Sequence, residues 1–208
     1  MKNGWYPLDM PTRRDATPRS STPAGSPSFA FIALARGINV GGKNRVSMKD
    51  LAQAFEASGG TNIKTYIQSG NVLFDCKDPA RCIAGVTRNL RESLQLEIPL
   101  VWRSAADYLR AVKANPFLAD GIDPASLSLG LLSNPPAPAA VRELNPNHSP
   151  GDQFRVIGNT MYLYQPNGIA RSTLTTAWID RALGVTSTFR NWKTATALTA
   201  LFSPSSGS

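Results

Sequence analysis

The stretch that most constrains the fold is FAFIALARGINVGGKNRVSMKD, residues 29–50, where a strand pattern, a glycine-rich turn and a helix start follow one another. Residues 29–35 are continuously apolar, which is typical of a strand covered on both faces. The turn then carries glycines that permit positive φ angles or the close approach of a ligand. Ser47 to Asp50 fits the Ser-x-x-acid capping pattern, so a helix is predicted from about Met48.

The same turn partly matches a nucleotide-binding P-loop, because four residues separate Gly37 from Gly42 and Lys43 follows. A P-loop needs Ser or Thr after the lysine to bind magnesium, and its helix starts there. Here Asn44 follows, and the cap places the helix start several residues later. Asp75 could imitate the second magnesium-binding motif, but it lies in a predicted hairpin strand. A P-loop is therefore not expected, and the glycines could serve only to permit the turn.

Composition sets wider limits on the function. The 208 residues are 42% hydrophobic and 17% charged, which is typical of a globular protein. No run approaches the roughly 18 apolar residues that a membrane span needs, so no membrane partner is expected. The net charge of +8 favours anionic partners, although nucleic-acid binding does not follow from it.

The chain ends and the cysteines indicate a cytoplasmic protein. Residues 1–28 are rich in Pro, Ser and Thr without an apolar period, which predicts a disordered tail that lacks the apolar core of a secretory signal. Residues 203–208 are a second loose end. Cys76 and Cys82 have no histidine nearby and suit neither a zinc site nor a redox pair, so free thiols are expected. We expect no metal and no cofactor.

Two successive segments of the chain show the same order of elements. In the first, we expect a strand at 29–35, a helix from 48, a hairpin of 63–67 with 72–74, a helix at 79–96, a strand at 98–102 and a helix at 104–114. In the second, we expect a strand at 127–132, a short helix to 144, paired strands at 154–157 and 161–164, a helix at 172–183, a strand at 185–189 and a terminal helix to 201. Both hairpins contain Gly-Asn.

This repetition predicts an α+β fold made by tandem duplication of two ferredoxin-like (βαββαβ) subdomains with antiparallel sheets, plus a C-terminal helix. The expected boundaries are 29–120 and 125–202, because the intervening loop is dense in turn residues.

The split βαβ arrangement brings the loop after the first strand and the hairpin turn to one edge of the sheet. Glycine amides, the cations Arg36 and Lys43, and the polar side chains of the turn would converge there, which suits a phosphate or carboxylate. The alternative is that these polar groups hydrogen-bond one another and fix two long turns. The polar residues concerned are Asn39, Gln68, Ser69 and Asn71.

Three motifs in this order, ALARGINVGGKN, TYIQSGNVLF and TFRNWKTATALTAL, resemble the bacterial family catalogued as domain of unknown function 1697. The resemblance covers about residues 29–202. It implies a cytoplasmic α+β protein of two ferredoxin-like subdomains in tandem, and it implies no activity. The first 28 residues depart from the usual start of the family and could be an over-called translation start. The family's signature residues fall on Arg36, Gly37, Asn39, Gly41, Gly42, Lys43, Gln68, Ser69, Gly70, Asn71, Arg190, Asn191, Trp192 and Thr194.

The third motif also has a physical interpretation. Asn191 is a good N-cap for the terminal helix, and Trp192 begins an apolar stripe directed at the second core. Arg190 beside it could pair with an anion or stack on an aromatic ring.

No catalytic group is recognisable. His148 is the one histidine and lies in a loop without a nucleophile, where we expect it to be solvated. Three hypotheses remain: a small-anion or nucleotide-binding module, a single-stranded nucleic-acid binding protein, and an enzyme acting on a phosphorylated or carboxylated metabolite. Asp75 and Tyr66 are the nearest titratable groups in sequence for the third.

The first hypothesis is preferred, and it expects Arg36 and Lys43 to be exposed and not paired with local acids. The ligand and the oligomeric state do not follow from the sequence. The candidate ligand-binding residues are Arg36, Gly37, Asn39, Gly41, Gly42, Lys43, Gln68, Ser69, Asn71, Arg190, Asn191 and Trp192.

Overall fold

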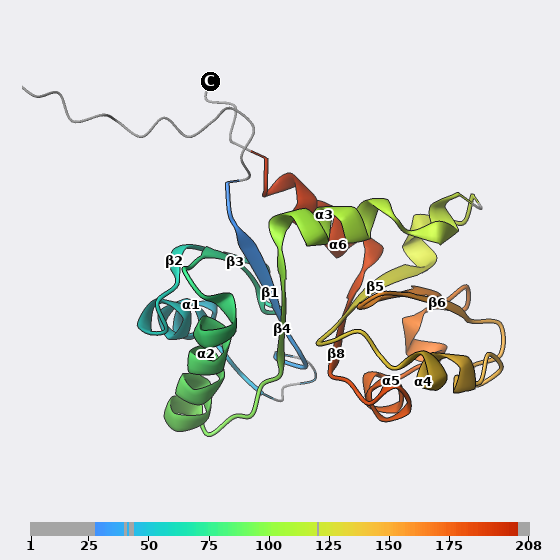
Figure 1. Ribbon diagram of the computed structural model, residues 1–208, viewed down its shortest axis with the longest axis horizontal. Helices are drawn as coiled ribbons and strands as arrows, with labels where there is room; N and C mark the ends of the chain where they lie inside the picture. Colours follow the sequence, from blue (N-terminus) through green and yellow to red (C-terminus); the bar gives the residue numbers. More distant parts are fainter. Residues whose placement is uncertain (1–27, 40, 42–43, 120, 204–208) are drawn as a thin grey trace, which may run out of the picture.

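The computed structural model describes residues 28–39, 41, 44–119 and 121–203, and within these ranges it has two four-stranded antiparallel sheets (Figure 1). The first sheet has the order β2-β3-β1-β4 and the second has the order β6-β7-β5-β8. The strands of the first sheet are β1 (Phe31–Ala35), β2 (Thr61–Tyr66), β3 (Asn71–Asp75) and β4 (Leu100–Ser104). Those of the second sheet are β5 (Leu127–Leu132), β6 (Gln153–Ile157), β7 (Thr160–Tyr164) and β8 (Ser187–Asn191).

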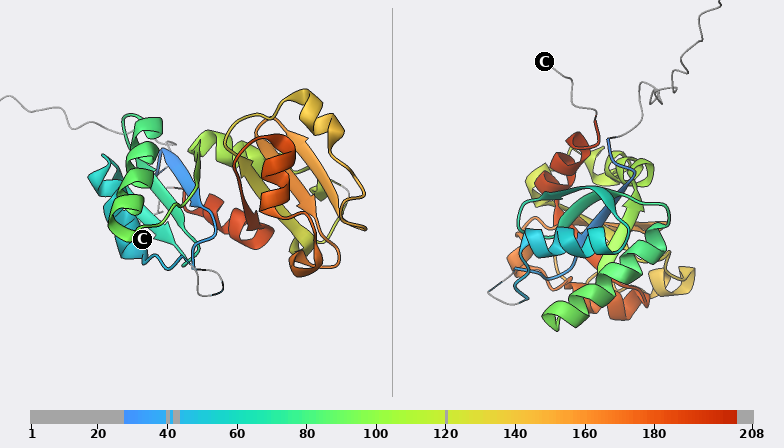
Figure 2. Two further views of the ribbon diagram at one scale, coloured as in Figure 1. Left: turned by 90° about the horizontal axis from the view of Figure 1, so that it is seen from below. Right: turned by 90° about the vertical axis from the view of Figure 1, so that its left-hand side faces the viewer.

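The helices cover the outer faces of both sheets and the top of the boundary between them. In Figures 1 and 2, α1 and α2 lie against the first sheet, α4 and α5 lie against the second, and α3 and α6 pack together where the sheets meet. We call β1 to α3 the first half and β5 to α6 the second half. The helices are α1 (Met48–Ala57), α2 (Pro79–Leu94), α3 (Ala105–Lys113), α4 (Pro138–Glu143), α5 (Thr176–Leu183) and α6 (Trp192–Ala200), with 3-10 turns at Pro116–Leu118, Pro124–Ser126 and Ile169–Arg171.

The largest core lies between the halves and belongs to both. Alternation along β1 sends Ile32 and Leu34 into this central core and Ala33 and Ala35 towards α1 and α2. The second half contributes Leu129 and other residues of β5 to the same cluster, and α3 and α6 close it from above. Two smaller cores lie under α1/α2 and under α4/α5. Because the central core contains side chains from both halves, burial of apolar area holds the halves together.

Most of the expected elements are present. The helix start at Met48 is confirmed, since the Ser47 hydroxyl accepts a hydrogen bond from the Asp50 N–H at 3.0 Å. The strands β4 and β8 begin two residues later than expected. The helix α5 begins at Thr176 rather than at 172, because residues 169–171 form a 3-10 turn and Thr175 caps the helix by accepting from the Trp178 N–H.

Of the loose ends predicted at residues 1–28 and 203–208, residues 1–27 and 204–208 lie outside the described residues, as do Gly42 and Lys43 of the candidate site. Ser28 and Ser203 are described and contact each other, since the Ser28 hydroxyl donates to the Ser203 carbonyl at 3.0 Å. Within the described ranges, the helices are all too short or too polar to cross a membrane.

Candidate functional site

The loop after β1 and the β2–β3 turn meet at one edge of the first sheet, as the topology predicts. The Ala35 N–H donates to the Gly70 carbonyl at 2.8 Å, and the Asn39 side-chain amide donates to the Gln68 carbonyl at 2.9 Å. Gly70 has φ +75°, and a Cβ there would lie 2.6 Å from the Ala35 Cβ and 2.7 Å from the Ile38 Cδ1. The two segments therefore approach as closely as a residue without a side chain allows.

Polar side chains at this edge hydrogen-bond to neighbouring groups. The Asn39 amide also donates to the Val46 carbonyl at 2.8 Å, and its oxygen accepts from the Val46 N–H at 3.0 Å. Buried Asn71 donates to the Tyr66 carbonyl at 3.0 Å and to the Ser69 hydroxyl at 2.9 Å. These two asparagines fix the loop and the turn, which is the local role that polar loop side chains commonly have.

Three of the five described non-glycine residues with positive φ lie at the same edge. Asn39 and Asn44 have φ values of 56° and 47°, in the left-handed region that asparagine tolerates. Ile67, the first residue of the turn after β2, has φ 47° and leaves 49% of its surface exposed. A β-branched residue in this region is a genuine outlier, and such strain is concentrated at functional sites.

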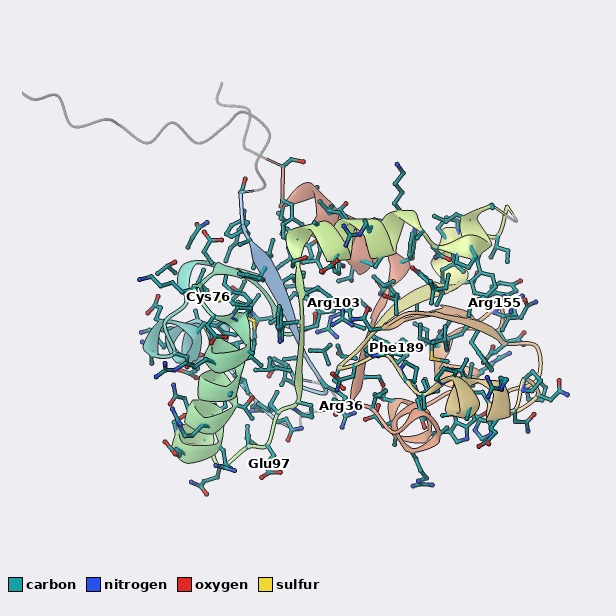
Figure 3. The ribbon with its side chains drawn as sticks, in the orientation of Figure 1. Arg36, Cys76, Glu97, Arg103, Arg155 and Phe189 are labelled. Atoms are coloured by element: carbon teal, nitrogen blue, oxygen red, sulfur yellow. The ribbon has the colours of Figure 1, made fainter. Side chains whose placement is uncertain are left out.

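Arg36 has an acidic partner from the other half of the chain. Its guanidinium pairs with the Asp180 carboxylate of α5, and its side chain is 32% exposed. The same carboxylate accepts from the Ser187 N–H at 2.8 Å and from the Ser187 hydroxyl at 2.6 Å. Arg36 therefore joins the halves (Figure 3). The preferred hypothesis expects Arg36 to be exposed and not paired with an acid, and the ion pair with Asp180 shows that this expectation is wrong.

Arg190 crosses from β8 into the first half. Its Nε donates to the Asn71 side-chain oxygen at 2.6 Å, and its Nη2 donates to the carbonyls of Ala35 and Ser69, each at 2.8 Å. Its Nη1 donates to the carbonyl of the preceding residue, Phe189, at 2.8 Å. Burial lowers the pKa of Arg190 to about 10. All of these acceptors are neutral, so hydrogen bonds hold the guanidinium without neutralising its charge.

Arg103 makes the reciprocal contact from β4 into the second half (Figure 3). Its Nη1 donates to the carbonyl of the preceding residue, Trp102, at 2.6 Å, and its Nη2 donates to the carbonyls of Leu132 and Asn159. Burial lowers the pKa of Arg103 to about 10. Ala35 ends β1 and Leu132 ends β5, so each arginine caps the first strand of the opposite half.

The C-terminal motif contributes to stability as well as to this contact. The Asn191 side chain caps α6 by accepting from the Thr194 N–H at 2.8 Å, which confirms the expected N-cap. Trp192 is 6% exposed and packs in a core, as expected, but this is the central core shared by both halves and not a core of the second half alone.

Titratable groups are poorly placed for chemistry at this edge. Asp75 is at the opposite end of β3 from the turn, where its carboxylate accepts from the Ala30 N–H at 2.6 Å and from Asn62 at 3.0 Å. His148 is not simply solvated, because its ring stacks on Trp178 at 4.0 Å. Within the described ranges, no three His, Cys, Asp or Glu side chains cluster as metal ligands.

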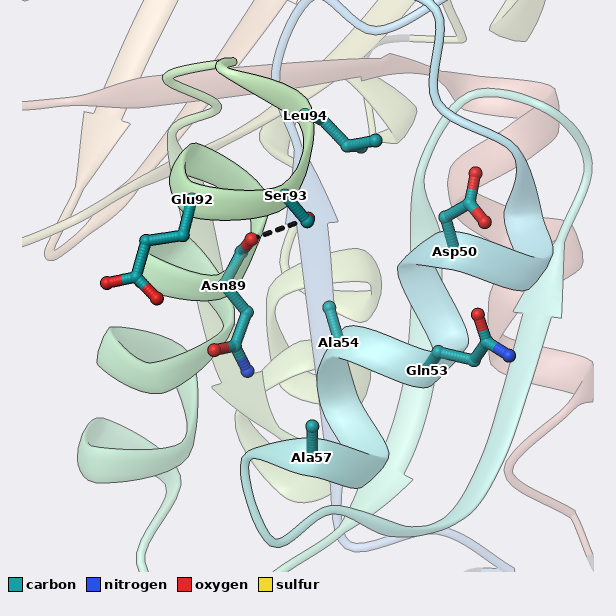
Figure 4. A pocket seen from close by; sticks show the side chains of 8 residues that line it. All are labelled: Asp50, Gln53, Ala54, Ala57, Asn89, Glu92, Ser93 and Leu94. Carbon is teal, nitrogen blue, oxygen red and sulfur yellow. Dashed lines mark hydrogen bonds between the residues drawn. The ribbon is translucent and has the colours of Figure 1, made fainter.

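A cleft of about 480 Å³ between α1 and α2 lies away from this edge and has the wrong charge for an anion (Figure 4). Its charged side chains are Asp50 and Glu92, and the rest of its lining is polar or apolar without a cation.

Arg103 and Asp180 did not emerge from the sequence as candidates. Arg103 could have been found by matching the two halves strand by strand, because it holds in β4 the position that Arg190 holds in β8. The register shows this: Arg103 lies opposite Ile32, three residues before the end of β1, and Arg190 lies opposite Leu129, three residues before the end of β5. No comparable pattern identifies Asp180, whose role depends on how the halves dock.

Comparisons with known proteins agree with the first two sequence motifs, and the third, at residues 188–201, lies outside the matched residues. The profile of the family described as "Protein of unknown function (DUF1697)" matches residues 29–162. The chain belongs to this family. No curated protein matches the chain. Among solved structures, a conserved bacterial protein, SP0830 from Streptococcus pneumoniae, is similar with a TM-score of 0.63 and 19% identity, covering 84% of this chain and 98% of that one. At this identity the likeness concerns the fold.

Proposed function

We propose that this member of the family is a small-anion-binding module whose ligand binds where the loop of residues 37–47 meets the turn of residues 67–71. The observation that carries the proposal is the charge of Arg190. Its guanidinium lies under this junction, bonds only to neutral acceptors among the described residues and keeps its positive charge. An anion bound above the guanidinium would be stabilised by Coulombic attraction, which is stronger there than in bulk water because the site is partly buried.

Three further features support a ligand site at the same edge. The strained and exposed Ile67 borders it, and residues strained in this way cluster at active sites and ligand-binding sites. Gly37 and Gly41 both have positive φ, with no heavy atom within 4 Å of where a Cβ would lie, so a ligand could approach their backbone. Arg45 is exposed in the same loop, and no ion pair involves it in the described part of the chain.

We also infer that the two halves are tandem copies of a ferredoxin-like unit, with boundaries near 29–120 and 125–202. The matching strand orders and the reciprocal arginines at the same register support this duplication. The Gly-Asn pairs of the two hairpins differ by one position in this register, because Asn71 lies opposite Leu34 and Thr160 lies opposite Leu131.

The test is a thermal-shift and calorimetric screen of the full chain against inorganic phosphate, nucleotides, sugar phosphates, carboxylates and short single-stranded oligonucleotides. A ligand that binds the native state adds about 2.7 kcal/mol of stability at a hundredfold excess over its Kd. The double variant Lys43→Gln/Arg45→Gln should abolish the shift while leaving the unliganded midpoint close to wild type. The matched control, Arg88→Gln/Arg91→Gln, removes two positive charges from an exposed face of α2. This control should show the same ligand-induced shift as the wild type.

Other outcomes would contradict the proposal in different ways. A phosphate or carboxylate shift of equal size in both double variants would place the ligand elsewhere. An oligonucleotide shift that is lost in the α2 control and kept in the loop variant would favour the nucleic-acid hypothesis. Turnover of a bound metabolite would favour the enzyme hypothesis.

A further inference from the structure

A second cleft lies between the halves, along the free edge of β4. Its volume is about 440 Å³, within the range of small-molecule sites. One wall is apolar and comes from α2 and β4, including Ile83 and Trp102. The other wall is polar and comes from the second half, with Ser133, Asn134 and Asn159. Arg103 lines the cleft between these walls.

Arg103 is buried in this cleft with one donor unused. The residue is 7% exposed, and its Nε is fully buried without a hydrogen-bond partner. Nearly all buried donors in proteins have a partner, because an unpaired donor loses its hydration without compensation. The unpaired Nε therefore leaves the buried charge of Arg103 incompletely compensated by the protein, although Nε itself has no surface that a ligand in the cleft could touch.

Comparison with Arg190 shows which acceptor is missing. The Nε of Arg190 donates to the side-chain oxygen of Asn71 at 2.6 Å. Thr160 holds the corresponding position in the second sheet, since it lies opposite Leu131 as Asn71 lies opposite Leu34. Threonine has no side-chain carbonyl, so the contact of Arg103 with the second half is one acceptor short.

The acid that lines the cleft, Asp107, lies close enough to favour the charged form of Arg103 but does not hydrogen-bond to it. Asp107 is paired with Arg110, and it accepts from the Ser104 hydroxyl at 2.6 Å. No described carboxylate hydrogen-bonds to Arg103. The amide side chain of Asn159 makes no hydrogen bond within the described residues, and that of Asn134 makes a long one to Ser133 at 3.5 Å.

We propose that this cleft binds a small organic anion, a carboxylate or phosphate that carries an apolar group. Its oxygens would pair with the Arg103 guanidinium and accept from the amides of Asn134 and Asn159, while its apolar part packs against Ile83 and Trp102. This site goes beyond the proposed function, because it lies on β4 and the second half and uses none of the residues of the 37–47 loop.

The experiment titrates the full chain by calorimetry with benzoate and phenyl phosphate, and with acetate and inorganic phosphate as probes that lack the apolar group. We expect saturable binding of benzoate or phenyl phosphate, tighter than that of its smaller counterpart, and the preferred head group separates carboxylate from phosphate ligands. Asn134→Asp places a carboxylate beside Arg103 at an exposed position and should weaken binding more than about tenfold through like-charge repulsion. Asn147→Asp makes the same change in the exposed loop after α4 and should leave the Kd unchanged.

A second variant, Ala80→Trp, fills the cleft from an exposed position on α2 without changing charge, and it should abolish binding. Absence of saturable binding in the wild type would overturn the proposal. So would a Kd that Asn134→Asp and Ala80→Trp leave unchanged. Binding that is lost in Lys43→Gln/Arg45→Gln and kept in Asn134→Asp would belong to the loop, which separates failure of this site from failure of the proposed function.

Discussion

At the scale of single residues, arginine is the side chain that joins the halves. Arg190 donates from three nitrogens to backbone and side-chain oxygens, and Arg103 donates from two nitrogens to backbone carbonyls, which a planar guanidinium can do and a lysine cannot. Arg36 adds an ion pair with Asp180 at the same boundary. The boundary is therefore specified by a few directed hydrogen bonds at its rim in addition to its apolar centre.

Replacement of Arg190 by alanine should lower the free energy of unfolding by about 3 kcal/mol, because it leaves the carbonyls of Ala35 and Ser69 and the oxygen of Asn71 without their donor. Arg190→Lys should recover less than half of this loss, since an ammonium cannot reach all three acceptors. Urea denaturation monitored by tryptophan fluorescence measures the unfolding free energy of both variants. Arg88→Ala is the control, as an exposed arginine for which no hydrogen bond is seen within the described residues, and it should stay within about 0.5 kcal/mol of wild type. Equal midpoints for Arg190→Ala and Arg88→Ala would show that the contact is not stabilising.

At the scale of elements, the two hairpin turns have the same backbone requirement and different surroundings. Gly70 and Gly158 both have positive φ, at +75° and +58°. A side chain at Gly70 would collide with Ala35 at the end of β1 and with Ile38 in the loop that follows. At Gly158, no heavy atom lies within 4 Å of where a Cβ would be. One turn packs against the neighbouring loop, and the other is open.

Gly158→Ala should therefore measure the cost of left-handed backbone alone, about 1 kcal/mol of unfolding free energy. Gly70→Ala should cost a further 1–3 kcal/mol, roughly, because the added methyl overpacks the junction of loop and turn. Thermal denaturation of the two variants gives the difference directly. Equal losses would mean that the loop moves aside without cost, and the close approach at Gly70 would then not constrain this edge.

The elements themselves could be predicted because their signals are local. The apolar run of β1, the Ser47 cap and the three- and four-residue spacing in α2 each depend on residues close in sequence. The predicted start of α5 at about residue 172 was wrong, because a 3-10 turn occupies residues 169–171 and Thr175 caps the helix. Asp75 is a poor candidate for chemistry because its carboxylate already accepts a hydrogen bond from the Ala30 N–H. The pairing of β1 with β3 places these two residues together.

At the scale of the whole molecule, the docking of the halves could not be predicted, because it depends on pairs such as Arg36 with Asp180 that lie far apart in the chain. The central core makes the halves interdependent. The hydroxyl of Tyr108 donates to the Ala195 carbonyl at 3.1 Å and joins α3 to α6. The hydroxyl of Tyr162 in β7 donates to the Ala111 carbonyl of α3 at 2.8 Å. Two buried phenols thus carry hydrogen bonds across the boundary.

Burial raises the pKa of Tyr162 to about 12, above the ordinary value near 10 for an unfolded chain. Because the folded-state pKa is the higher one, the contribution of this group to stability is complete below about pH 10 and is lost as pH rises towards 12. At pH 8, Tyr162→Phe should cost about 1 kcal/mol, since it leaves the Ala111 carbonyl unpaired. At pH 11, ionisation of the unfolded wild type removes about 1.4 kcal/mol that the phenylalanine variant keeps, so the two stabilities should converge or change order. Urea denaturation of both proteins at pH 8, 9.5 and 11 tests this, and a difference that stays constant over that range would show that Tyr162 is not shielded by the contact between the halves.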